Sequence, residues 1–251
     1  MNLTGNTILV TGGTSGIGRA LASQFHQRGN RVIITGRREG LLNEITTEHP
    51  GMIGIRLDVE DPENIAALAS HIRETFPDLN TLINNAGITK TQDLVSGSAD
   101  ISLSEAIIRT NITGVLHITA ALLPVLQSQQ AATIITTTSG LAFVPLANYP
   151  TYCASKAFLH SWLQSLRTQL RATSVEVLEL APPYVQTELH GPEQASDPHA
   201  MPLTEYIAEV MDLIGAGYPE NGEILVERVK MLRMAEASRD YQHVYAMLNG
   251  A

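Results

Sequence analysis

Short β-branched runs alternate with longer stretches of helical periodicity along most of this chain. Because a helix between two successive strands allows them to lie parallel, the alternation predicts βαβ units around a parallel sheet. We therefore expect an α/β protein: a single doubly wound Rossmann domain, with a parallel sheet of about seven strands and helices on both faces. The strand-like runs are residues 7–11, 31–35, 52–57, 81–84, 133–138, 174–180 and 223–227.

Domain organisation follows from the absence of any internal repeat, low-complexity tract or linker in the sequence, so we predict one domain, 1–251. Residues 184–204 form a long stretch without periodicity. Such stretches inside compact domains are often lids, so we interpret this one as a substrate flap rather than a plain surface excursion. The C-terminal tail, 229–251, is predicted to be helical over 229–248, and to pack or oligomerise rather than catalyse.

The charge and composition of the chain favour small-molecule chemistry. The net charge of -9 argues against nucleic-acid binding, which needs a basic patch. The single cysteine, Cys153, excludes an intramolecular disulfide and favours a reducing compartment. The histidines show no metal-ligand spacing, so we predict no metal and expect His117 and His160 on helix faces. With no signal peptide and no apolar run of transmembrane length, we predict a cytoplasmic protein without membrane association.

A glycine-rich turn, Thr11-Gly12-Gly13-Thr14-Ser15-Gly16-Ile17-Gly18, separates the first predicted strand from the first predicted helix. Glycines allow a tight turn and a close approach of the backbone to phosphates, while the helix N-terminus offers free N–H groups and a favourable dipole. The turn therefore predicts a dinucleotide pyrophosphate site, with a purely structural turn as the alternative. The predicted cofactor contacts here are Gly12, Thr14, Ser15, Gly16, Ile17 and Gly18.

The residues after the second predicted strand indicate which dinucleotide binds. An NAD-binding protein would place a carboxylate there to hold the ribose 2′-hydroxyl, but this chain has Gly36-Arg37-Arg38. Two guanidinium groups can pair with a 2′-phosphate, so NADP(H) is the predicted cofactor, with contacts from Arg37 and Arg38. The alternative is a solvated basic pair, which the dipole at the start of a helix disfavours.

Several motifs occur along the chain in a definite order and spacing. They are Thr11-Gly12-x-x-x-Gly16-x-Gly18, Asn84-Asn85-Ala86-Gly87, Asn111, Ser139 and Tyr152-x-x-x-Lys156. Together they resemble the signature of the short-chain dehydrogenase/reductases, over residues from about 5 to 227. Within that family, the 181–187 stretch and the opening segment look most like the DltE-like oxidoreductases.

The resemblance implies further cofactor contacts. Asp58 and Val59 are expected to flank the adenine, and Val185 and Thr187 to touch the nicotinamide carboxamide. Many relatives have Pro-Gly where this chain has Pro182-Pro183, which stiffens the entry to the flap; Pro182 is included among the contacts. The adenosine ribose region is expected to be lined by Asn85, Ala86 and Gly87.

The chemical groups can also be argued from their spacing. Tyr152 and Lys156 are four residues apart in a stretch of helical periodicity, so both lie on one helix face. A neighbouring ammonium favours the phenolate, so we expect Lys156 to lower the pKa of Tyr152, which then exchanges a proton with the substrate oxygen. Ser139, after the fifth predicted strand, can hydrogen-bond the same oxygen. We also expect Lys156 to hold the nicotinamide ribose, and the family assigns Asn111 to a water-mediated proton relay. A solvated Tyr–Lys pair is the alternative.

The expected substrate is a ketone, aldehyde or secondary alcohol with a hydrophobic body. A catalytically silent NADP(H)-binding regulatory or redox-sensing module is the main rival function, and a nucleotide-sugar epimerase or dehydratase is weakened by the short chain. Two apolar helices, around 104–126 and 152–170, predict a homodimer or homotetramer. The predicted pocket residues are Leu141, Phe143, Val144, Tyr149, Tyr184 and Leu189.

Overall fold

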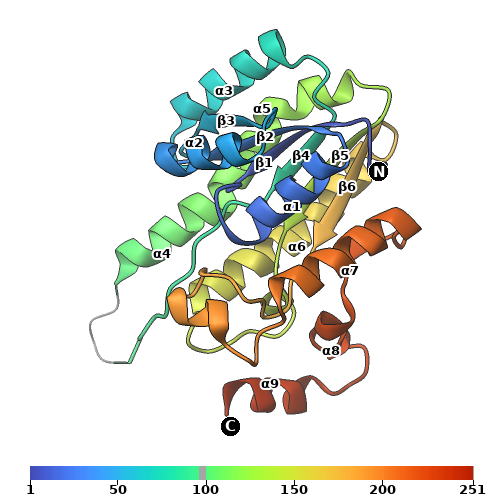
Figure 1. The fold of residues 1–251 in the computed structure, drawn as a ribbon. Coiled ribbons are helices and arrows are strands. Elements are labelled where there is room, and N and C mark those ends of the chain that lie inside the picture. The colour runs from blue at the N-terminus through green and yellow to red at the C-terminus, as the bar shows by residue number, and fades with distance from the viewer. Residues whose placement is uncertain (96–99, 251) are drawn as a thin grey trace.

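The fold, seen in a computed structural model that describes residues 1–95 and 100–250, is built on one parallel sheet (Figure 1). The strand order is β3-β2-β1-β4-β5-β6-β7, so the chain builds one half outward from β1 and then crosses to begin the other half at β4. This confirms the predicted doubly wound α/β domain, whose ligands bind where the order reverses. In sheet order, the strands are β3 Ile53–Arg56, β2 Arg31–Gly36, β1 Thr7–Thr11, β4 Thr81–Asn84, β5 Ala132–Thr137, β6 Val175–Leu180 and β7 Glu223–Ile224.

Two apolar clusters sandwich the sheet because successive strand residues point to opposite faces. Ile8 and Val10 of β1 pack with α1 (Gly16–Gln27), α2 (Glu39–Glu48) and α7 (Leu203–Ala216) on one face. Leu9, between them, packs with α3 (Pro62–Thr75), α5 (Gly114–Gln127) and α6 (Pro150–Leu170) on the other. The fully buried strands therefore need helices on both faces, as predicted.

A π-helical turn, Arg109–Thr113, joins α4 (Ile101–Ile108) to α5. Over its 27 residues, the stretch Ile101–Gln127 is long and apolar enough to cross a membrane, which corrects the expectation that no apolar run reaches that length. Core helices pass the same test, and 44% of the most apolar window is buried inside the protein. Ile118 and Leu122 of α5 belong to the core.

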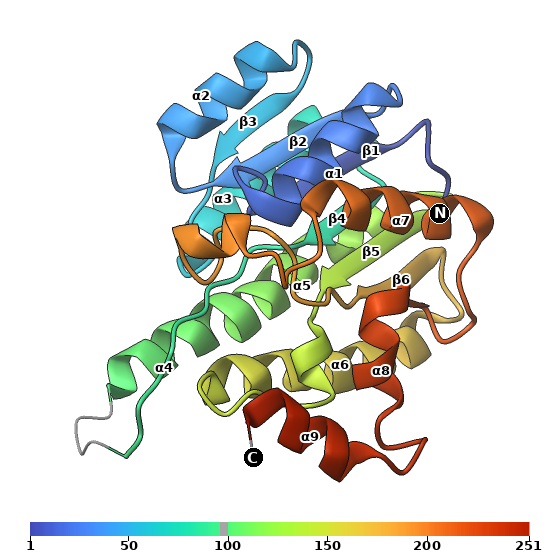
Figure 2. The ribbon, with the colours of Figure 1, turned by 60° about the horizontal axis from the view of Figure 1, so that its bottom comes forward.

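The C-terminal tail differs from the single helix expected over 229–248. It forms a short 3-10 turn, Glu227–Val229, then α8 (Lys230–Met234) and α9 (Tyr241–Asn249), both beside the α6 side of the molecule (Figure 2). Arg239 has φ 61, which ends the helical path, and the Ser238 hydroxyl donates to the carbonyl oxygens of Met234 and Ala235. Such local bonds compete with continued helix, so the tail bends into two short helices, whose side chains pack together in one small cluster with Val144.

The predicted flap is partly ordered by its own backbone contacts. A β-bridge joins Val185 to Met201, a short 3-10 turn covers Pro192–Ser196, and α7 begins at Leu203. The buried side chain of Gln194 donates to the carbonyl oxygen of Val185 at 2.7 Å. The flap is therefore a loop closed at its base rather than a structureless excursion.

Candidate active site

A cavity of about 800 Å³ opens at the carboxyl ends of the central strands. Its walls come from the glycine-rich turn, the ends of β2, β4 and β5, helix α6, the flap and the C-terminal tail. With two exceptions, Gly18 and Asn111, every predicted catalytic or cofactor-binding residue lines this cavity. The fold thus brings together, at one strand edge, residues that are far apart in the sequence.

The glycine-rich turn has a tight backbone that needs glycine at several positions. Gly12 and Gly16 adopt positive φ, and a Cβ on Gly12 would lie 2.8 Å from the Ala86 Cα. A Cβ on Gly18 would lie 2.4 Å from the Gly12 carbonyl oxygen, so Gly18 supports the turn from inside α1 instead of lining the cavity. No acidic residue stands in the first turn of α1, so the free N–H groups there remain suited to an anion.

Arg38 and Arg37 lie at the same end of the cavity but are held differently. The Arg38 Nη2 donates to the hydroxyls of Thr14 at 3.2 Å and Ser15 at 3.1 Å, so its guanidinium lies against the phosphate turn. The Arg37 side chain is 61% exposed, and its Nη1 is 4.0 Å from the Glu60 carboxylate. Both guanidiniums remain available to a 2′-phosphate, and Arg38 is the more firmly placed of the two.

The candidate catalytic side chains, Ser139, Tyr152 and Lys156, come from two elements that meet at the cavity. Tyr152 and Lys156 lie on α6, both at most 5% exposed, with the Lys156 Nζ 5.7 Å from the Tyr152 ring centroid. The Lys156 Nζ donates to the Thr137 carbonyl oxygen at 2.8 Å, which anchors the helix to the end of β5. Ser139 follows that strand and accepts a hydrogen bond from the Leu141 N–H. The expected one-face arrangement is present in the structure.

The pKa of Tyr152 shifts in the direction opposite to the one expected from Lys156. Burial raises the pKa of Tyr152 to about 12, and a hydrogen bond with Ser139 only partly opposes that rise. Burial also lowers the pKa of Lys156 to about 8, while the charge of Glu179 acts to raise it. Tyr152 therefore keeps its proton at neutral pH, the state needed to donate it to a carbonyl oxygen.

Asn111 lies in the π-helical turn, fully buried behind the cavity wall. Its side-chain amide donates to the Ile88 carbonyl oxygen at 3.0 Å and the Ser155 hydroxyl at 3.1 Å, and its Oδ1 accepts from the Ile88 N–H. A Cβ on Gly87 would lie 3.4 Å from the Asn111 Oδ1 and 3.7 Å from the Lys156 Nζ, so both side chains lie close to Gly87. A single π turn in a long helix often marks a functional site.

The substrate end of the cavity includes four of the predicted pocket residues, Leu141, Tyr149, Tyr184 and Leu189. Two others do not line it. The ring of Phe143 packs against His160, with centroids 4.9 Å apart. Val144 is buried in a small cluster with the tail. Both follow the 3-10 turn Gly140–Ala142, whose path the sequence did not indicate.

Sequence reasoning missed several residues of the cavity lining, among them Leu232, Leu248 and His190. Leu232 and Leu248 line the cavity from the tail, whose bend could not be read from its helical periodicity. His190 of the flap lies among three tyrosine rings, with its centroid 4.7 Å from that of Tyr149 and 6.2 Å from that of Tyr152. The tail, expected only to pack or oligomerise, is thus part of the pocket wall.

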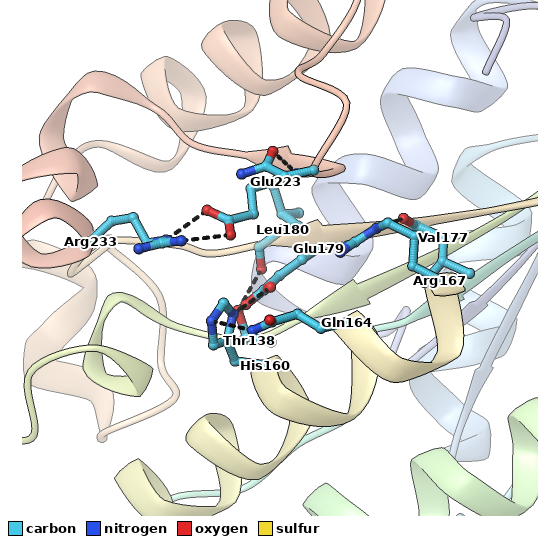
Figure 3. Close-up of polar contacts among 10 residues, drawn as sticks. Thr138, His160, Gln164, Arg167, Val177, Glu179, Leu180, Glu223 and Arg233 are labelled. Carbon is cyan, nitrogen blue, oxygen red and sulfur yellow. Dashed lines mark hydrogen bonds and ion pairs between the residues drawn. The ribbon is translucent and has the colours of Figure 1, made fainter. Parts of the chain in front are cut away.

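A buried polar cluster lies beside the cavity, between α6 and the end of the sheet (Figure 3). His160, Glu179 and Glu223 have potential metal-ligand atoms within 4.8 Å of one another, a grouping that sequence spacing cannot reveal. Protein groups already contact these atoms: Arg233 binds both carboxylate oxygens of Glu223, and His160 lies between Glu179 and Gln164. His160 is thus half-buried in a network, not simply placed on a helix face.

Comparison with known proteins gives the family. The short chain dehydrogenase family model matches residues 6–198. The chain is 40% identical to the uncharacterized oxidoreductase DltE of Bacillus subtilis, over 99% of this chain and 98% of that protein. It is 32% identical to sulfoacetaldehyde reductase 2 of Chromohalobacter salexigens, over 92% and 95%. A short chain dehydrogenase from Burkholderia cenocepacia, solved in complex with NADP, has a TM-score of 0.82 at 26% identity, covering 99% of both chains. The chain belongs to the short-chain dehydrogenase/reductase family of oxidoreductases.

Proposed function

We propose that the protein transfers a hydride between NADP(H) and a carbonyl or secondary alcohol, with Tyr152 as the general acid/base. The observation that carries this proposal is one cavity lined by both the glycine-rich turn and Ser139, Tyr152 and Lys156. A silent cofactor sensor would not need a proton donor at the inner end of its nucleotide site, so the rival function is disfavoured.

Each side chain has a role that follows from its surroundings. In the reduction direction, bound NADPH supplies the hydride, and the protonated phenol of Tyr152 supplies the proton to the carbonyl oxygen. The Ser139 hydroxyl, beside Tyr152, hydrogen-bonds that oxygen and stabilises its developing charge. Lys156 places a positive charge next to the phenol and is available to the cofactor ribose.

The substrate end of the cavity favours a neutral molecule with an apolar body. Its walls there are mostly leucine and tyrosine, and the cations among the described lining residues are Arg37, Arg38 and Lys156. Arg38 lies against the phosphate turn, Arg37 lies beside Glu60, and Lys156 lies with Tyr152, so none is placed to bind a substrate anion at this end. A sulfonate such as sulfoacetaldehyde, the substrate named for one relative, finds no matching cation at this end.

A substrate panel tests the proposed function. Neutral ketones and aldehydes with apolar groups should be reduced with NADPH, and secondary alcohols should be oxidised with NADP⁺. Anionic carbonyl compounds of the same size should show kcat/KM at least about tenfold lower, because burying an unpaired carboxylate or sulfonate is costly. Absorbance at the NADPH band measures both reactions, and a panel without any turnover would favour the sensor instead.

His190 predicts a finer preference within that substrate class. Its ring nitrogens make no hydrogen bond with other described residues, and burial lowers its pKa, so a neutral imidazole faces the cavity near Tyr152. For a ketone with a second oxygen, His190→Leu should lower kcat/KM about fivefold to tenfold, the effect of one lost hydrogen bond. A matched ketone without that oxygen is the control. Equal effects of His190→Leu on the two ketones would contradict this role.

We also propose that the protein is cytoplasmic and a homodimer or homotetramer. The interface is predicted from two apolar helices, but many of their apolar side chains are buried inside the chain itself. Leu159 and Leu163 of α6 are examples. Exposed apolar side chains remain on the adjoining helices α4 and α6, at Ile101, Ile108 and Phe158. Their proximity supports an interface between copies.

We expect sedimentation at micromolar concentration to give a species of at least twice the 27.1 kDa chain mass. Phe158→Asp combined with Ile108→Asp should shift it toward the monomer, because two carboxylates would be buried at the contact. Lys230→Asp, on the exposed part of the tail, is a control for added negative charge. A wild-type protein sedimenting only as the monomer would refute the proposal.

A further inference from the structure

Glu179 is a fully buried carboxylate close to the chemical groups but outside the cavity lining. It lies on β6, between β5 and β7. Its Oε1 accepts a hydrogen bond from the Thr138 hydroxyl at 2.7 Å, and its Oε2 lies 2.8 Å from the His160 Nδ1 (Figure 3). A buried charge is costly unless it is paired and hydrogen-bonded, and here both oxygens have partners.

The two partners of Glu179, Thr138 and His160, lie next to candidate catalytic residues. Thr138 immediately precedes Ser139, and its N–H also donates to the Leu180 carbonyl oxygen at 2.8 Å. His160 lies one helical turn after Lys156 on α6, so the two side chains share one face of that helix. One carboxylate therefore connects the strand end that carries Ser139 to the helix that carries Tyr152 and Lys156.

We propose, resting on the function proposed above, that Glu179 is a positioning residue for hydride transfer. Its carboxylate holds the segment that leads from β5 into Ser139 against α6. Its negative charge also stabilises the protonated form of Lys156. No motif in the sequence pointed to this residue, because a glutamate within an apolar strand becomes informative only when its partners are known.

The negative charge of Glu179 acts on Lys156 and on two nearby arginines, Arg167 and Arg233. Burial lowers the pKa of Lys156 to about 8, and the negative charge of Glu179 is the opposing influence. Removing that charge should therefore lower the pKa of Lys156 further. The same charge also acts on Arg167 of α6, whose pKa is lowered mainly by burial.

The remaining titratable neighbours do not replace Glu179. Glu223 of β7 forms two hydrogen bonds with Arg233 from α8, at 2.7 and 2.9 Å. His160 contacts Glu179 from α6, and Gln164 occupies the other ring nitrogen of His160. Tyr152 faces Lys156 from the same helix and keeps its proton well above neutral pH. Glu223 is thus a matched buried carboxylate whose charge is paired with Arg233, while Glu179 is the carboxylate whose charge acts on Lys156.

The chain has three lysines, Lys90, Lys156 and Lys230, so the titration of Lys156 can be followed directly. We would label the lysine Cε with ¹³C, record NMR spectra from pH 6 to 11 without cofactor, and assign Lys156 by its loss in Lys156→Arg. The wild-type midpoint is expected near pH 8. Glu179→Gln should move it toward acid by about half a pH unit or more, since only the charge is removed.

Glu223→Gln is the control and should leave the Lys156 midpoint within about 0.2 pH units of wild type. An unmoved midpoint in Glu179→Gln, or an equal shift in both variants, would overturn the electrostatic part of the proposal. Because this readout needs neither substrate nor cofactor, it remains decisive even if no carbonyl is turned over. It therefore separates failure of this inference from failure of the proposed function.

Thr138→Val tests the positioning part and serves as a second variant if Glu179→Gln does not fold. It removes one hydrogen bond to Glu179 but keeps the charge. We expect kcat to fall about fivefold to tenfold with KM for NADPH unchanged, while the Lys156 midpoint stays at or above the wild-type value. Unchanged kcat, or a midpoint shifted toward acid, would contradict the assignment of Thr138 and Glu179 to positioning.

Discussion

Tyr152→Phe is expected to lower kcat by roughly 10²- to 10⁴-fold while leaving the affinity for NADPH nearly unchanged. Phenylalanine keeps the ring and removes the hydroxyl that donates the proton. The loss should lie toward the upper end of that range, because the same hydroxyl hydrogen-bonds the developing oxyanion. Tyr152 is 5% exposed, so a similar ring preserves the packing of α6. The measurement is kcat at saturating NADPH, using the best substrate from the panel.

Lys156→Ala is the informative comparison for Tyr152→Phe. Lys156 anchors α6 through the Thr137 carbonyl oxygen and is also available to the cofactor ribose, so both kcat and NADPH affinity should fall. NADPH fluorescence measures affinity without any turnover. A Tyr152→Phe protein that kept most of its activity would remove Tyr152 from the mechanism. A Tyr152→Phe protein that lost NADPH binding would show instead that the ring supports the cofactor.

The activity should also depend on pH in a direction set by Lys156. Its pKa of about 8 lies below that of an ordinary lysine because burial disfavours the ammonium. Lys156 is therefore protonated below about pH 8 and loses its charge above it. Since Tyr152 stays protonated in both ranges, we attribute the expected alkaline fall in kcat/KM of the free enzyme to Lys156.

The architecture could be predicted because local patterns agreed with the global fold. The first and fourth strands, Thr7–Thr11 and Thr81–Asn84, begin and end where their β-branched runs do. The last strand is shorter than predicted: only Glu223–Ile224 pairs with β6, and the chain then turns into the 3-10 segment Glu227–Val229. Most of the residues placed by motif line the predicted cavity at the strand ends, while Gly18 and Asn111 support its wall from behind.

What could not be predicted depends on contacts between distant segments. The sequence placed Lys156 beside Tyr152 correctly, yet the direction of the tyrosine pKa shift was wrong because the extent of burial cannot be read from helical spacing. Leu248 reaches the cavity only because the tail bends at Arg239, a non-glycine residue with φ 61. Glu179 became interpretable only once Thr138 was seen beside it.

The second large effect is expected in cofactor preference. The unaltered protein should bind NADPH at least about tenfold more tightly than NADH, and Arg37→Asp should reverse that preference by adding the carboxylate that suits a ribose 2′-hydroxyl. Arg38→Asp should cost NADPH affinity more, from about tenfold to a hundredfold. Its guanidinium lies against the phosphate turn through Thr14 and Ser15, whereas Arg37 is largely exposed and close to Glu60.

Calorimetric titration of both cofactors measures this preference, and Arg73→Asp is the matched control. Arg73 is exposed on α3 outside the cavity lining, and its replacement changes the net charge by the same amount. A general electrostatic effect would weaken NADPH binding equally in the Arg38→Asp and Arg73→Asp proteins. A local contact with the 2′-phosphate predicts loss only at Arg37 and Arg38, and little change in NADH affinity for Arg73→Asp. Equal affinities of the unaltered protein for NADPH and NADH would refute the assignment of Arg37 and Arg38 to the 2′-phosphate. In that case the extra phosphate of NADPH would add nothing to the binding free energy.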